Sequence, residues 1–333
     1  MIIPMHLGEK SYDIILERGC LQNAGQLLNL NRKVLVITDD GIPPEYAQTV
    51  VSQSKEAYCV TVPQGETSKG FATLERICRE LMERHFSRKD CIVAVGGGVV
   101  GDLSGFAASC YMRGIDFYNI PTTVLSQVDS SIGGKTAINL DTVKNIVGAF
   151  YQPKRVLIDL DVLKSLPARQ ISNGLAEAIK MGLTSDASLF ELFEREDYLD
   201  QMELIIEKSL KVKRDVVEQD ETEQGLRKML NFGHTFGHGY ENVFFEKLYH
   251  GECVALGMLA LCSDKVKARL LPVLQRVNLP TSVSCDKNAV WDAVTHDKKF
   301  SAGKASFVYV GEVGQGEIQD LPIPELREKF FRE

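Results

Sequence analysis

Short apolar runs of strand length alternate with helical stretches through about the first 150 residues of the chain. The runs lie in KVLVITDD (33–40), AYCVTVPQGE, DCIVAVGGGVVGD and FYNIPTT, and a helical stretch from about Lys69 to His85 separates two of them. Strands that alternate with helices build a parallel sheet with helices on both faces. DIILERG, which comes earlier, fits an N-terminal hairpin. The sequence therefore predicts an α/β domain over residues 1–152.

The pattern changes after YQPKRVLIDLDVL. From about Pro167 onward, apolar residues recur with helical spacing in five stretches, which span residues 174–182, 188–194, 202–219, 226–244 and 252–270. A short β-like piece, ASFVYVGEVGQGEI, comes near the end. We therefore predict a second, mostly α-helical domain over residues 153–333.

Charge and composition exclude several classes of function. The 333-residue chain has a net charge of −7 and no block of like charge, so it carries no footprint for nucleic acid or for an anionic membrane. Its start lacks the layout of a signal peptide, and it has no run of about 18 apolar residues that could span a membrane. Eight scattered cysteines without a CxxC pair indicate reduced, mostly buried thiols of a cytoplasmic protein.

GGGVVG (96–101) follows one of the apolar runs and precedes a helix. Gly96, Gly98 and Gly101 fit the G-x-G-x-x-G pattern, in which the chain turns tightly and a phosphate binds at a helix N-terminus. A tightly packed turn without any ligand explains the same glycines, and the pattern lies on a later βα unit than is usual for dinucleotide binding. Asp102, directly after it, is either an acceptor for a cofactor or an acidic residue of the first helical turn.

NFGHTFGHGYE (231–241) contains two of the six histidines, four residues apart. On one helix through this segment, four polar residues at spacings of four, three and four share one face: Arg227, Asn231, His234 and His238. Gly233 and Gly237 each weaken a helix by about 1 kcal/mol, which is explained if a ligand or another backbone comes close. A buried polar stripe of this kind needs partners.

A metal ion is one such partner, because imidazole and carboxylate suit zinc, which in catalytic sites has three protein ligands and one open position. His250 in LYHGE follows after a turn, and Glu177 in NGLAEAIK would complete the set from the start of another buried helix, with Lys180 one turn on. Structural histidines with satisfied hydrogen bonds are the alternative. Spacing alone leaves open which of His234 and His238 binds the metal.

Several cationic segments also contain glycine or other small residues. Each cation alone fits a solvated surface charge, but together they indicate anion sites. The residues are Lys135 in SSIGGKTAIN, Lys144 with Asn145 in VKNIVGAF, Arg113 in YMRG, and Lys298 and Lys299 in DKKF.

Six segments together resemble the 3-dehydroquinate synthases, a family of sugar phosphate cyclases. They are GGGVVGDLSGFAASCYMRG, IPTTVLSQVDSSIGGKTAIN, KNIVGAFYQP, NGLAEAIK, RKMLNFGHTFGHGYE and HGECVALGM. The resemblance runs from about PQGETSK to beyond DKKF, which is most of the chain. It implies a Rossmann-like α/β N-terminal domain and a mostly α-helical C-terminal domain, with the histidine stripe on the face that holds metal and substrate.

The resemblance also implies the site residues. The zinc ligands fall on Glu177, His234 and His250, with Co²⁺ as a substitute, and His238 is left to handle a proton or bind substrate. The NAD site falls on Asp39, Glu66, Lys69, Gly98, Val99, Val100, Gly101, Asp102, Thr122, Thr123, Asp129, Lys135 and Lys144. The substrate site falls on Arg113, Asp129, Lys135, Asn145, Lys180, Lys213, Arg227, Asn231 and His238, with Lys298 or Lys299 at the phosphate. The catalytic residues among them are Lys135, Lys180, Lys213, Asn231 and His238.

The family's substrate is 3-deoxy-D-arabino-heptulosonate 7-phosphate, an anionic sugar phosphate, and its product is 3-dehydroquinate of the shikimate pathway to aromatic amino acids. The resemblance implies transient oxidation with NAD, loss of phosphate, reduction and an internal aldol closure, with no net redox change. It also implies a homodimer, in which Arg113 of one subunit serves the phosphate site of the other.

Other sugar phosphate cyclases are the nearest alternative. The set Lys213, Arg227 and Asn231 argues against inosose and valiolone synthases, whose substrates lack a carboxylate, but it leaves an aminodehydroquinate synthase open. A metal-dependent polyol or alcohol dehydrogenase would release NADH stoichiometrically and would not need paired phosphate and carboxylate sites. A non-catalytic relative that binds nucleotide would be expected to have lost metal or lysine positions that are present here.

Overall fold

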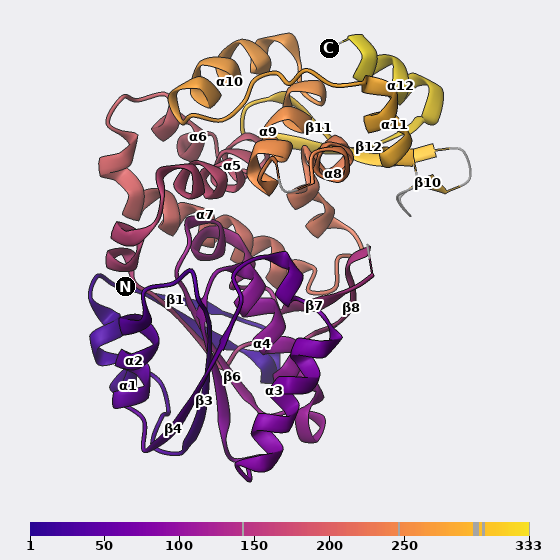
Figure 1. Ribbon diagram of the computed structural model, residues 1–333. Coiled ribbons are helices and arrows are strands. Elements are labelled where there is room, and N and C mark those ends of the chain that lie inside the picture. The colour runs from indigo at the N-terminus through magenta and orange to yellow at the C-terminus, as the bar shows by residue number, and fades with distance from the viewer. Residues whose placement is uncertain (142, 246, 296–299, 302–303, 333) are drawn as a thin grey trace. The chain divides into compact units, whose positions relative to one another are not determined.

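The structure is a computed structural model that describes residues 1–141, 143–245, 247–295, 300–301 and 304–332. It divides into two compact units, Met1–Pro167 and Ala168–Glu333. Figure 1 traces the chain from indigo at the N-terminus to yellow at the C-terminus. The predicted phosphate lysines, Lys298 and Lys299, lie outside the described residues.

Unit 1 is built on a seven-stranded sheet with the strand order β1-β2-β9-β6-β5-β3-β4. The strands are β1 (Ile2–Met5), β2 (Tyr12–Leu16), β3 (Lys33–Asp39), β4 (Glu56–Val62), β5 (Cys91–Gly96), β6 (Asp116–Pro121) and β9 (Arg155–Ile158). Neighbouring strands pair in parallel, except that β1 and β2 form an antiparallel hairpin at one edge. The predicted parallel sheet and N-terminal hairpin are therefore confirmed.

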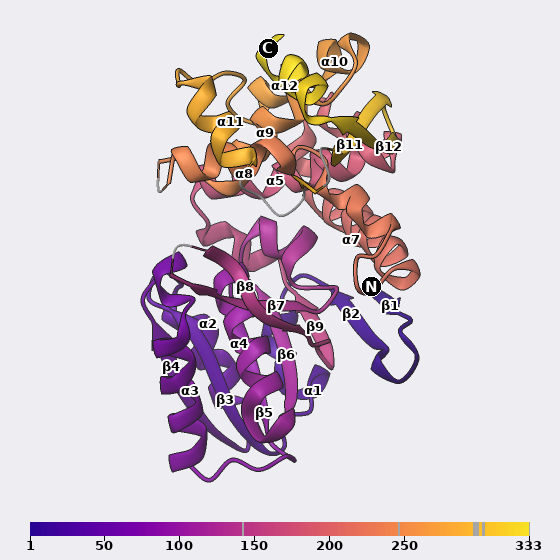
Figure 2. The same ribbon diagram turned by 90° about the vertical axis from the view of Figure 1, so that its right-hand side faces the viewer.

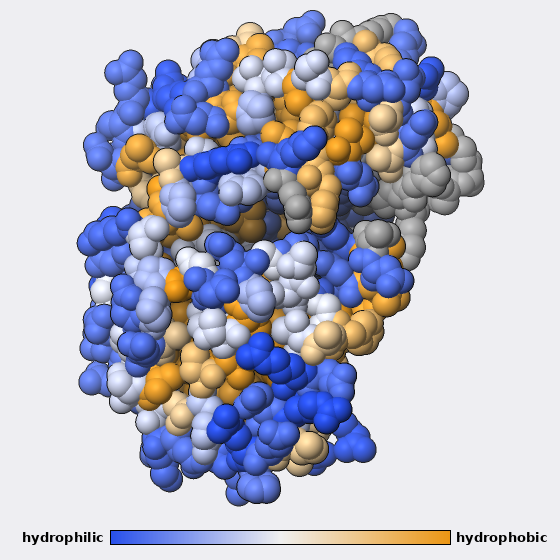
Figure 3. Space-filling model, in the orientation of Figure 1, coloured by the Kyte–Doolittle hydropathy of each residue, from blue (hydrophilic) through white to orange (hydrophobic). Residues whose placement is uncertain are grey.

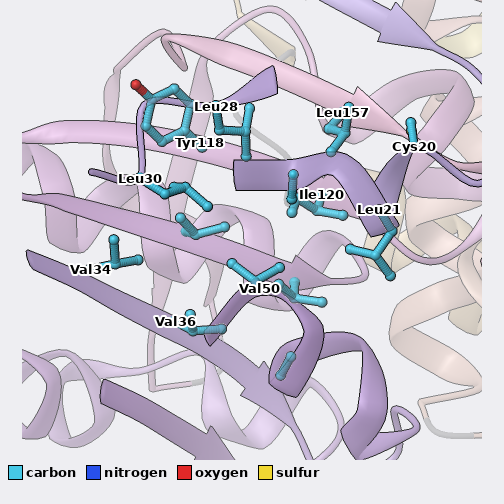
Figure 4. Packing of buried hydrophobic residues seen from close by; sticks show 14 of the residues in the cluster. Cys20, Leu21, Leu28, Leu30, Val34, Val36, Val50, Tyr118, Ile120 and Leu157 are labelled. Atoms are coloured by element: carbon cyan, nitrogen blue, oxygen red, sulfur yellow. The ribbon is translucent and has the colours of Figure 1, made fainter. Parts of the chain in front are cut away.

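Alternation along the strands fills a core on each face of this sheet. In β3, Val34 and Val36 belong to one buried cluster, whereas Leu35 and Ile37 belong to another. Figure 4 shows the first cluster, where Val34 and Val36 lie among apolar side chains from other strands and from the helices that cover this face. Burying one such side chain contributes about 1.5–3 kcal/mol, so these two clusters hold the sheet in register.

Helices cover both faces of the sheet (Figure 1). One face packs against α1 (Ala24–Leu27) and α2 (Pro44–Ser52), and the other packs against α3 (Phe71–Glu83) and α4 (Gly98–Cys110). Shorter helical turns join these elements, and they are η1 (Gly8–Lys10), η2 (Cys20–Asn23), η3 (Glu66–Ser68), η4 (Tyr111–Arg113), the π-helical η5 (Ser126–Ser130) and η6 (Leu160–Ser165). A two-stranded antiparallel hairpin of β7 (Lys135–Leu140) and β8 (Val143–Phe150) packs over α4 (Figure 2).

The boundary between the units differs from the one predicted at residues 152 and 153. Residues 153–167 belong to unit 1, because β9 pairs in parallel with both β2 and β6 inside the sheet. The change in sequence pattern at this point marks the last strand of the sheet and not the start of the helical unit.

Unit 2 is mostly helical. Its helices are α5 (Ala168–Thr184), α6 (Ala187–Phe193), η7 (Tyr198–Gln201), α7 (Met202–Gln219), η8 (Leu226–Asn231), α8 (His234–Val243), α9 (His250–Ala260), α10 (Asp264–Arg276), α11 (Lys287–Thr295) and α12 (Ile323–Arg332). A three-stranded antiparallel sheet joins β10 (Phe300–Ser301), β11 (Lys304–Glu312) and β12 (Gln315–Pro322). Together with the α/β architecture of unit 1, this confirms the predicted fold class.

Two properties of the surface complete the description. On the face that Figure 3 shows, hydrophilic residues are spread over both units and small hydrophobic groups interrupt them, as is usual for a surface in contact with water. Among the described residues, the chain forms no helix with the length and apolar character needed to span a membrane.

Candidate functional site

Three side chains of types that can bind a metal ion meet in unit 2. Glu177 lies in the middle of α5, not at the helix start predicted for it, while His234 and His250 are the first residues of α8 and α9. One ligand atom of each lies within 4.8 Å of the other two. Glu177 Oε1 is 3.7 Å from His234 Nε2 and 3.4 Å from His250 Nε2. Ligand atoms bound to a tetrahedral zinc ion are about 3.3 Å apart, which is close to both distances.

Hydrogen bonds to the outer nitrogens orient both imidazoles. His234 Nδ1 lies 3.1 Å from the carbonyl oxygen of Phe232, which can only accept, so Nδ1 carries the proton. His250 Nδ1 lies 3.4 Å from Oε2 of Glu241. The Nε2 atoms are therefore the ones that face Glu177, an arrangement found at many metal-binding histidines.

The electrostatics of the cluster favour a cation. Burial alone would raise the pKa of Glu177, but Lys180 and then the two histidines hold it well below its usual range. Burial lowers the pKa of His234 well below its usual value and keeps the ring neutral. Burial would lower the pKa of His250 as well, yet Glu177 and Glu241 raise it to about 10. The ionised Glu177 and the neutral His234 thus have the forms that bind a metal ion, whereas His250 must lose a proton first.

One buried oxygen supports the fit of this cluster to a metal ion. Glu177 is fully buried, and its Oε2 accepts a hydrogen bond from Lys180 Nζ. Its Oε1 is also buried and makes no hydrogen bond within the described part of the chain. The groups that face it are the imidazoles of His234 and His250, at 3.7 and 3.4 Å, and an ionised oxygen is costly in a protein interior unless it is closely paired. A divalent cation held by Oε1 and the two Nε2 atoms would satisfy it.

Glycines allow the helices that carry the histidines to pack closely. A Cβ atom on Gly257 of α9 would lie 2.0 Å from the carbonyl oxygen of Gly233, directly before α8. A Cβ atom on Gly237 would lie 3.3 Å from the carbonyl oxygen of Cys253. The close approach of another backbone, expected from Gly233 and Gly237, is therefore found.

The predicted single helix through residues 226–244 is wrong. Gly233 has a φ of 78° and separates the 3-10 helix η8 from α8, because this left-handed conformation cannot continue a right-handed helix. Arg227 and Asn231 therefore lie on η8, whereas His234 and His238 lie on α8. The ring centroid of His238 is 5.5 Å from that of His234 and 6.4 Å from that of His250, and His238 does not belong to the three-residue cluster.

The remaining predicted substrate residues of unit 2 are buried cations on neighbouring helices. Lys180, Lys213 and Arg227 are 1%, 6% and 2% exposed, on α5, α7 and η8, which pack against one another. Arg227 Nη1 donates to the carbonyl oxygen of Glu221, and Asn231 Nδ2 donates to Glu223 Oε1 at 2.6 Å. Three buried cations in one helical layer are suited to anionic groups.

Unit 1 places its predicted nucleotide residues at one edge of the sheet. The parallel strands β3, β5 and β6 end at Asp39, Gly96 and Pro121, and ligands of open α/β sheets bind outside this carboxyl edge. The other predicted residues follow these strands or β4 in the chain: Glu66, Lys69, Gly98, Val99, Val100, Gly101, Asp102, Thr122 and Thr123.

The close packing of the glycine turn is visible in its surroundings. A Cβ atom on Gly101 would lie 3.1 Å from Nδ2 of Asn119, and one on Gly98 would lie 3.0 Å from Oγ of Ser130. Close packing therefore accounts for part of the glycine pattern, as expected for a tightly packed turn that binds no ligand. The turn still leads from β5 through Gly97 into α4, which begins at Gly98.

Charged side chains at this edge form a network. Lys69, which is 5% exposed, donates through Nζ to Asp102 Oδ2 and to Asn145 Oδ1, at 2.5 Å each. The pKa of Asp39 is raised, chiefly by burial, and its Oδ1 accepts a hydrogen bond of 2.9 Å from the backbone of Gly41. Asp102 therefore pairs with a buried lysine of this chain. The alternative that it is an acidic residue of the first helical turn is wrong, because the first turn of α4 contains no acidic residue.

The other predicted residues of unit 1 lie on short elements. Arg113 ends η4 with a φ of 68°, and Asp129 lies in the π-helical turn η5. Lys135 opens β7, and Lys144 lies in β8 with Asn145.

Three further groups were not predicted. Glu241 lies beside His250, and Asn139 bonds to the segment that contains Glu66 and Lys69. Arg169 makes a bidentate contact with Glu252, which caps the start of α9. The only sequence signal for Glu241 is its place in the segment that also holds the two histidines, since its partner lies nine residues later and beyond a turn.

The chain is similar to known proteins over nearly its full length. Two family models match consecutive parts of the chain: 3-dehydroquinate synthase N-terminal over residues 59–173 and 3-dehydroquinate synthase C-terminal over residues 174–300. A 3-dehydroquinate synthase of Microcystis aeruginosa is 39% identical over 97% of this chain and 96% of its own length. One of Streptococcus thermophilus is 40% identical over 98% of this chain and 99% of its own length.

Solved structures share the fold. A 2-deoxy-scyllo-inosose synthase complexed with carbaglucose-6-phosphate, NAD⁺ and Co²⁺ superposes with a TM-score of 0.89 at 22% identity and covers 99% of both chains. A 2-epi-5-epi-valiolone synthase from Streptomyces hygroscopicus, with NAD⁺ and Zn²⁺ bound, has a TM-score of 0.88 at 25% identity over 98% of both chains. A probable glycerol dehydrogenase from Sinorhizobium meliloti is more distant, with a TM-score of 0.61 at 16% identity over 96% of this chain and 95% of its own.

Proposed function

Because the chain belongs to the 3-dehydroquinate synthase family, we propose that it converts 3-deoxy-D-arabino-heptulosonate 7-phosphate to 3-dehydroquinate and inorganic phosphate. The enzyme is a lyase and serves aromatic amino acid biosynthesis through the shikimate pathway. The observation that carries the proposal is the cluster of Glu177, His234 and His250 beside the buried Lys180, in a chain that aligns with its relatives over nearly its full length.

Glu177, His234 and His250 hold a divalent metal ion, zinc or cobalt. The support is the ionised, buried Oε1 of Glu177 that makes no hydrogen bond among the described residues, and the two Nε2 atoms that face it. The relatives solved with NAD⁺ and Co²⁺ or Zn²⁺ are consistent with this choice of metal.

NAD is held at the carboxyl edge of the sheet in unit 1. Its phosphates would be held at Gly98 to Asp102, where α4 begins and the first backbone N–H groups precede the helical hydrogen bonds, which start at Gly101. Asp39, Glu66 and Lys69 bind the remaining polar groups, together with Thr122, Thr123, Asp129, Lys135 and Lys144. The support is their common location after parallel strands.

When bound, NAD supplies reversible hydride transfer and the metal supplies Lewis-acid polarisation of a ring hydroxyl. The substrate would be oxidised to a ketone, lose a proton from the acidified neighbouring carbon and phosphate from the carbon beyond it, be reduced again, open its ring and close a carbocycle by an internal aldol reaction. Lys180, Lys213, Arg227 and Asn231 bind its anionic and hydroxyl groups with Asn145, and His238 moves a proton near the oxidised hydroxyl.

The assay that tests this function follows phosphate release while recording NADH absorbance. With trace NAD⁺ and zinc, we expect many phosphates released per NAD⁺, no lasting NADH, and loss of turnover after chelation. Accumulation of NADH in proportion to substrate would instead indicate a dehydrogenase. The aminodehydroquinate alternative is tested with the amino analogue of the substrate, which should be turned over far more slowly than the hydroxy compound.

The role of His238 has its own test. His238→Ala should lower kcat strongly and leave zinc content unchanged, because His238 lies outside the metal cluster. An exposed histidine, His6, provides the control, since H6A should leave both unchanged. Full turnover of H238A would remove His238 from the mechanism.

We also propose that the enzyme is a cytoplasmic homodimer in which Arg113 serves the phosphate site of the partner subunit. The basis is the match of this chain to the family, and the exposed position of Arg113 at the end of η4 fits a role outside its own subunit.

A further inference from the structure

One asparagine joins the β7–β8 hairpin to the segment that contains Glu66 and Lys69. The backbone N–H of Asn139 donates to the carbonyl oxygen of Lys69 at 2.7 Å. Its Nδ2 donates to Glu66 Oε1 at 2.8 Å, and its Oδ1 accepts from the backbone N–H of Asn145 at 2.8 Å. Both ends of the side-chain amide and the backbone donor of this half-buried residue are therefore used.

A second link closes the same network. Lys69 Nζ bridges Asn145 Oδ1 and Asp102 Oδ2, at 2.5 Å each. Asn145 is thus held by Asn139 at its backbone and by Lys69 at its side chain. The hairpin packs over α4, which contains Asp102 beyond its first turn. The network therefore joins the hairpin, the segment of Glu66 and Lys69, and α4 within one unit (Figure 2).

The backbone at Asn145 explains why it must be held. Its φ is 54°, in the left-handed region that L-residues seldom adopt and that asparagine tolerates better than most. A hydrogen bond to its N–H stabilises this conformation locally.

We propose that Asn139 is a positioning residue for the nucleotide. It fixes Glu66 and Lys69 against the hairpin that carries Lys135 and Lys144. The inference rests on the proposed function, because it takes Glu66 and Lys69 as NAD-binding groups. The amide is suited to the task because it offers a donor to the carboxylate of Glu66 and an acceptor to the N–H of Asn145. A carboxylate offers only acceptors, and an alanine offers neither.

The first test compares two substitutions in the full-length enzyme by calorimetric titration with NAD⁺. N139A removes both side-chain bonds, and N139D retains the acceptor but sets a second negative charge against Glu66. We expect the Kd for NAD⁺ to rise about tenfold or more in each, because a hydrogen bond to a charged group is lost. KM for NAD⁺ should rise by a larger factor than kcat falls.

A double substitution separates positioning from general damage. In E66Q/N139D the glutamine amide can donate to the new carboxylate, so the pairing is restored with donor and acceptor exchanged. We expect E66Q/N139D to bind NAD⁺ more tightly than the product of the two single effects predicts. The control is N29D, which makes the same chemical change at an exposed asparagine of unit 1 and should bind NAD⁺ as the wild type does.

Hydrogen exchange tests the positioning role of Asn139 in the absence of cofactor. In the NAD-free protein, N139A should increase deuterium uptake at the Asn145 amide and leave the core strands β3 and β5 protected. If wild type binds no NAD⁺, the proposed function fails. If wild type binds NAD⁺ but N139A changes neither its Kd nor exchange at Asn145, Asn139 does not position the site.

Discussion

Among single residues, His250 should make binding at the proposed metal site depend on pH. Glu177 and Glu241 stabilise its protonated form more strongly than burial opposes it, so its pKa is about 10 in the protein without metal. A histidine must be neutral to bind a metal ion. At neutral pH the incoming ion must therefore displace a proton from this residue, whereas His234 is already neutral.

The expected result is that the apparent zinc affinity of the metal-free protein rises with pH. Below pH 10, each unit of pH should change the affinity by about tenfold, and about one proton should leave per zinc bound. Competition with a chelator of known affinity, corrected for its own protonation, measures the first effect, and a pH indicator in weak buffer measures the second.

The matched variant for this experiment is E241Q. It removes one carboxylate from His250, lowers its pKa and should reduce the proton release at alkaline pH. Zinc affinity that does not vary between pH 7 and pH 9 would contradict this account of His250.

Among the secondary-structure elements, α8 and α9 determine the geometry of the cluster. Each begins at a ligand, and the two helices pack backbone to backbone through glycine. Helix propensity and packing make opposite predictions for Gly257 in the interior of α9. Alanine would favour the isolated helix by about 1 kcal/mol, but its Cβ atom would lie 2.0 Å from the carbonyl oxygen of Gly233.

Packing should dominate in Gly257→Ala, since the atoms that a Cβ would meet are all backbone. We expect the free energy of unfolding to fall by about 1–3 kcal/mol, as in other overpacked cores. Zinc affinity should fall too, because Gly233 immediately precedes His234. Urea unfolding checks the first effect, with G311A as control, where the closest side-chain atom is 3.8 Å away. An increase in stability would show that α8 and α9 move apart freely.

These elements also show where sequence reasoning reaches its limit. The apolar periodicity of residues 226–244 predicts helix correctly on both sides of Gly233, but it carries no sign of the break. The low helix propensity of glycine does not reveal whether the φ of Gly233 is positive, because the backbone conformation there depends on packing against α9. Spacing therefore left His234 and His238 equivalent, although only His234 joins the cluster among the described residues.

At the scale of the whole molecule, the fold class followed from the sequence and the position of the boundary did not. Alternating strands and helices fix a parallel sheet, because few other arrangements bury such runs. The partners of β9 are β2 and β6, which lie far away in the sequence, so local patterns could not assign β9 to unit 1. The cysteines illustrate the same point: all eight are free, but only three are fully buried, fewer than predicted.

The three buried cysteines allow the opening of each unit to be measured separately. Cys20 and Cys91 lie in unit 1, where burial is the main cause that raises the pKa of each to about 12, and Cys253 lies in unit 2. Because the proposed zinc site exists only in the folded form of unit 2, removing zinc should speed alkylation of Cys253 more than that of Cys20 or Cys91. Mass spectrometry of labelled peptides measures these rates. Equal acceleration of all three would mean that the units open together.

The proposed dimer can be tested by mixing two inactive variants. R113A lacks the arginine offered to the partner, and E177A lacks a metal ligand in its own subunit. Refolded or subunit-exchanged mixtures should recover about a quarter of wild-type activity, because half of the dimers are mixed and each has one intact site. The singly substituted proteins, each carried through the same procedure alone, are the controls. Mixtures that remain inactive would place Arg113 in its own subunit's site.

The break at Gly233 has an evolutionary consequence. In a helix continuous from Leu226 to Val243, every inserted or deleted residue before His234 would rotate the metal ligand by about 100° around the helix axis. A left-handed glycine interrupts that coupling, so the segment Leu226–Asn231 can change in length and composition while α8 stays in place. Descendants of one ancestor can thus acquire new preferences for anionic groups without giving up the metal site, which is one way for a shared fold to diversify.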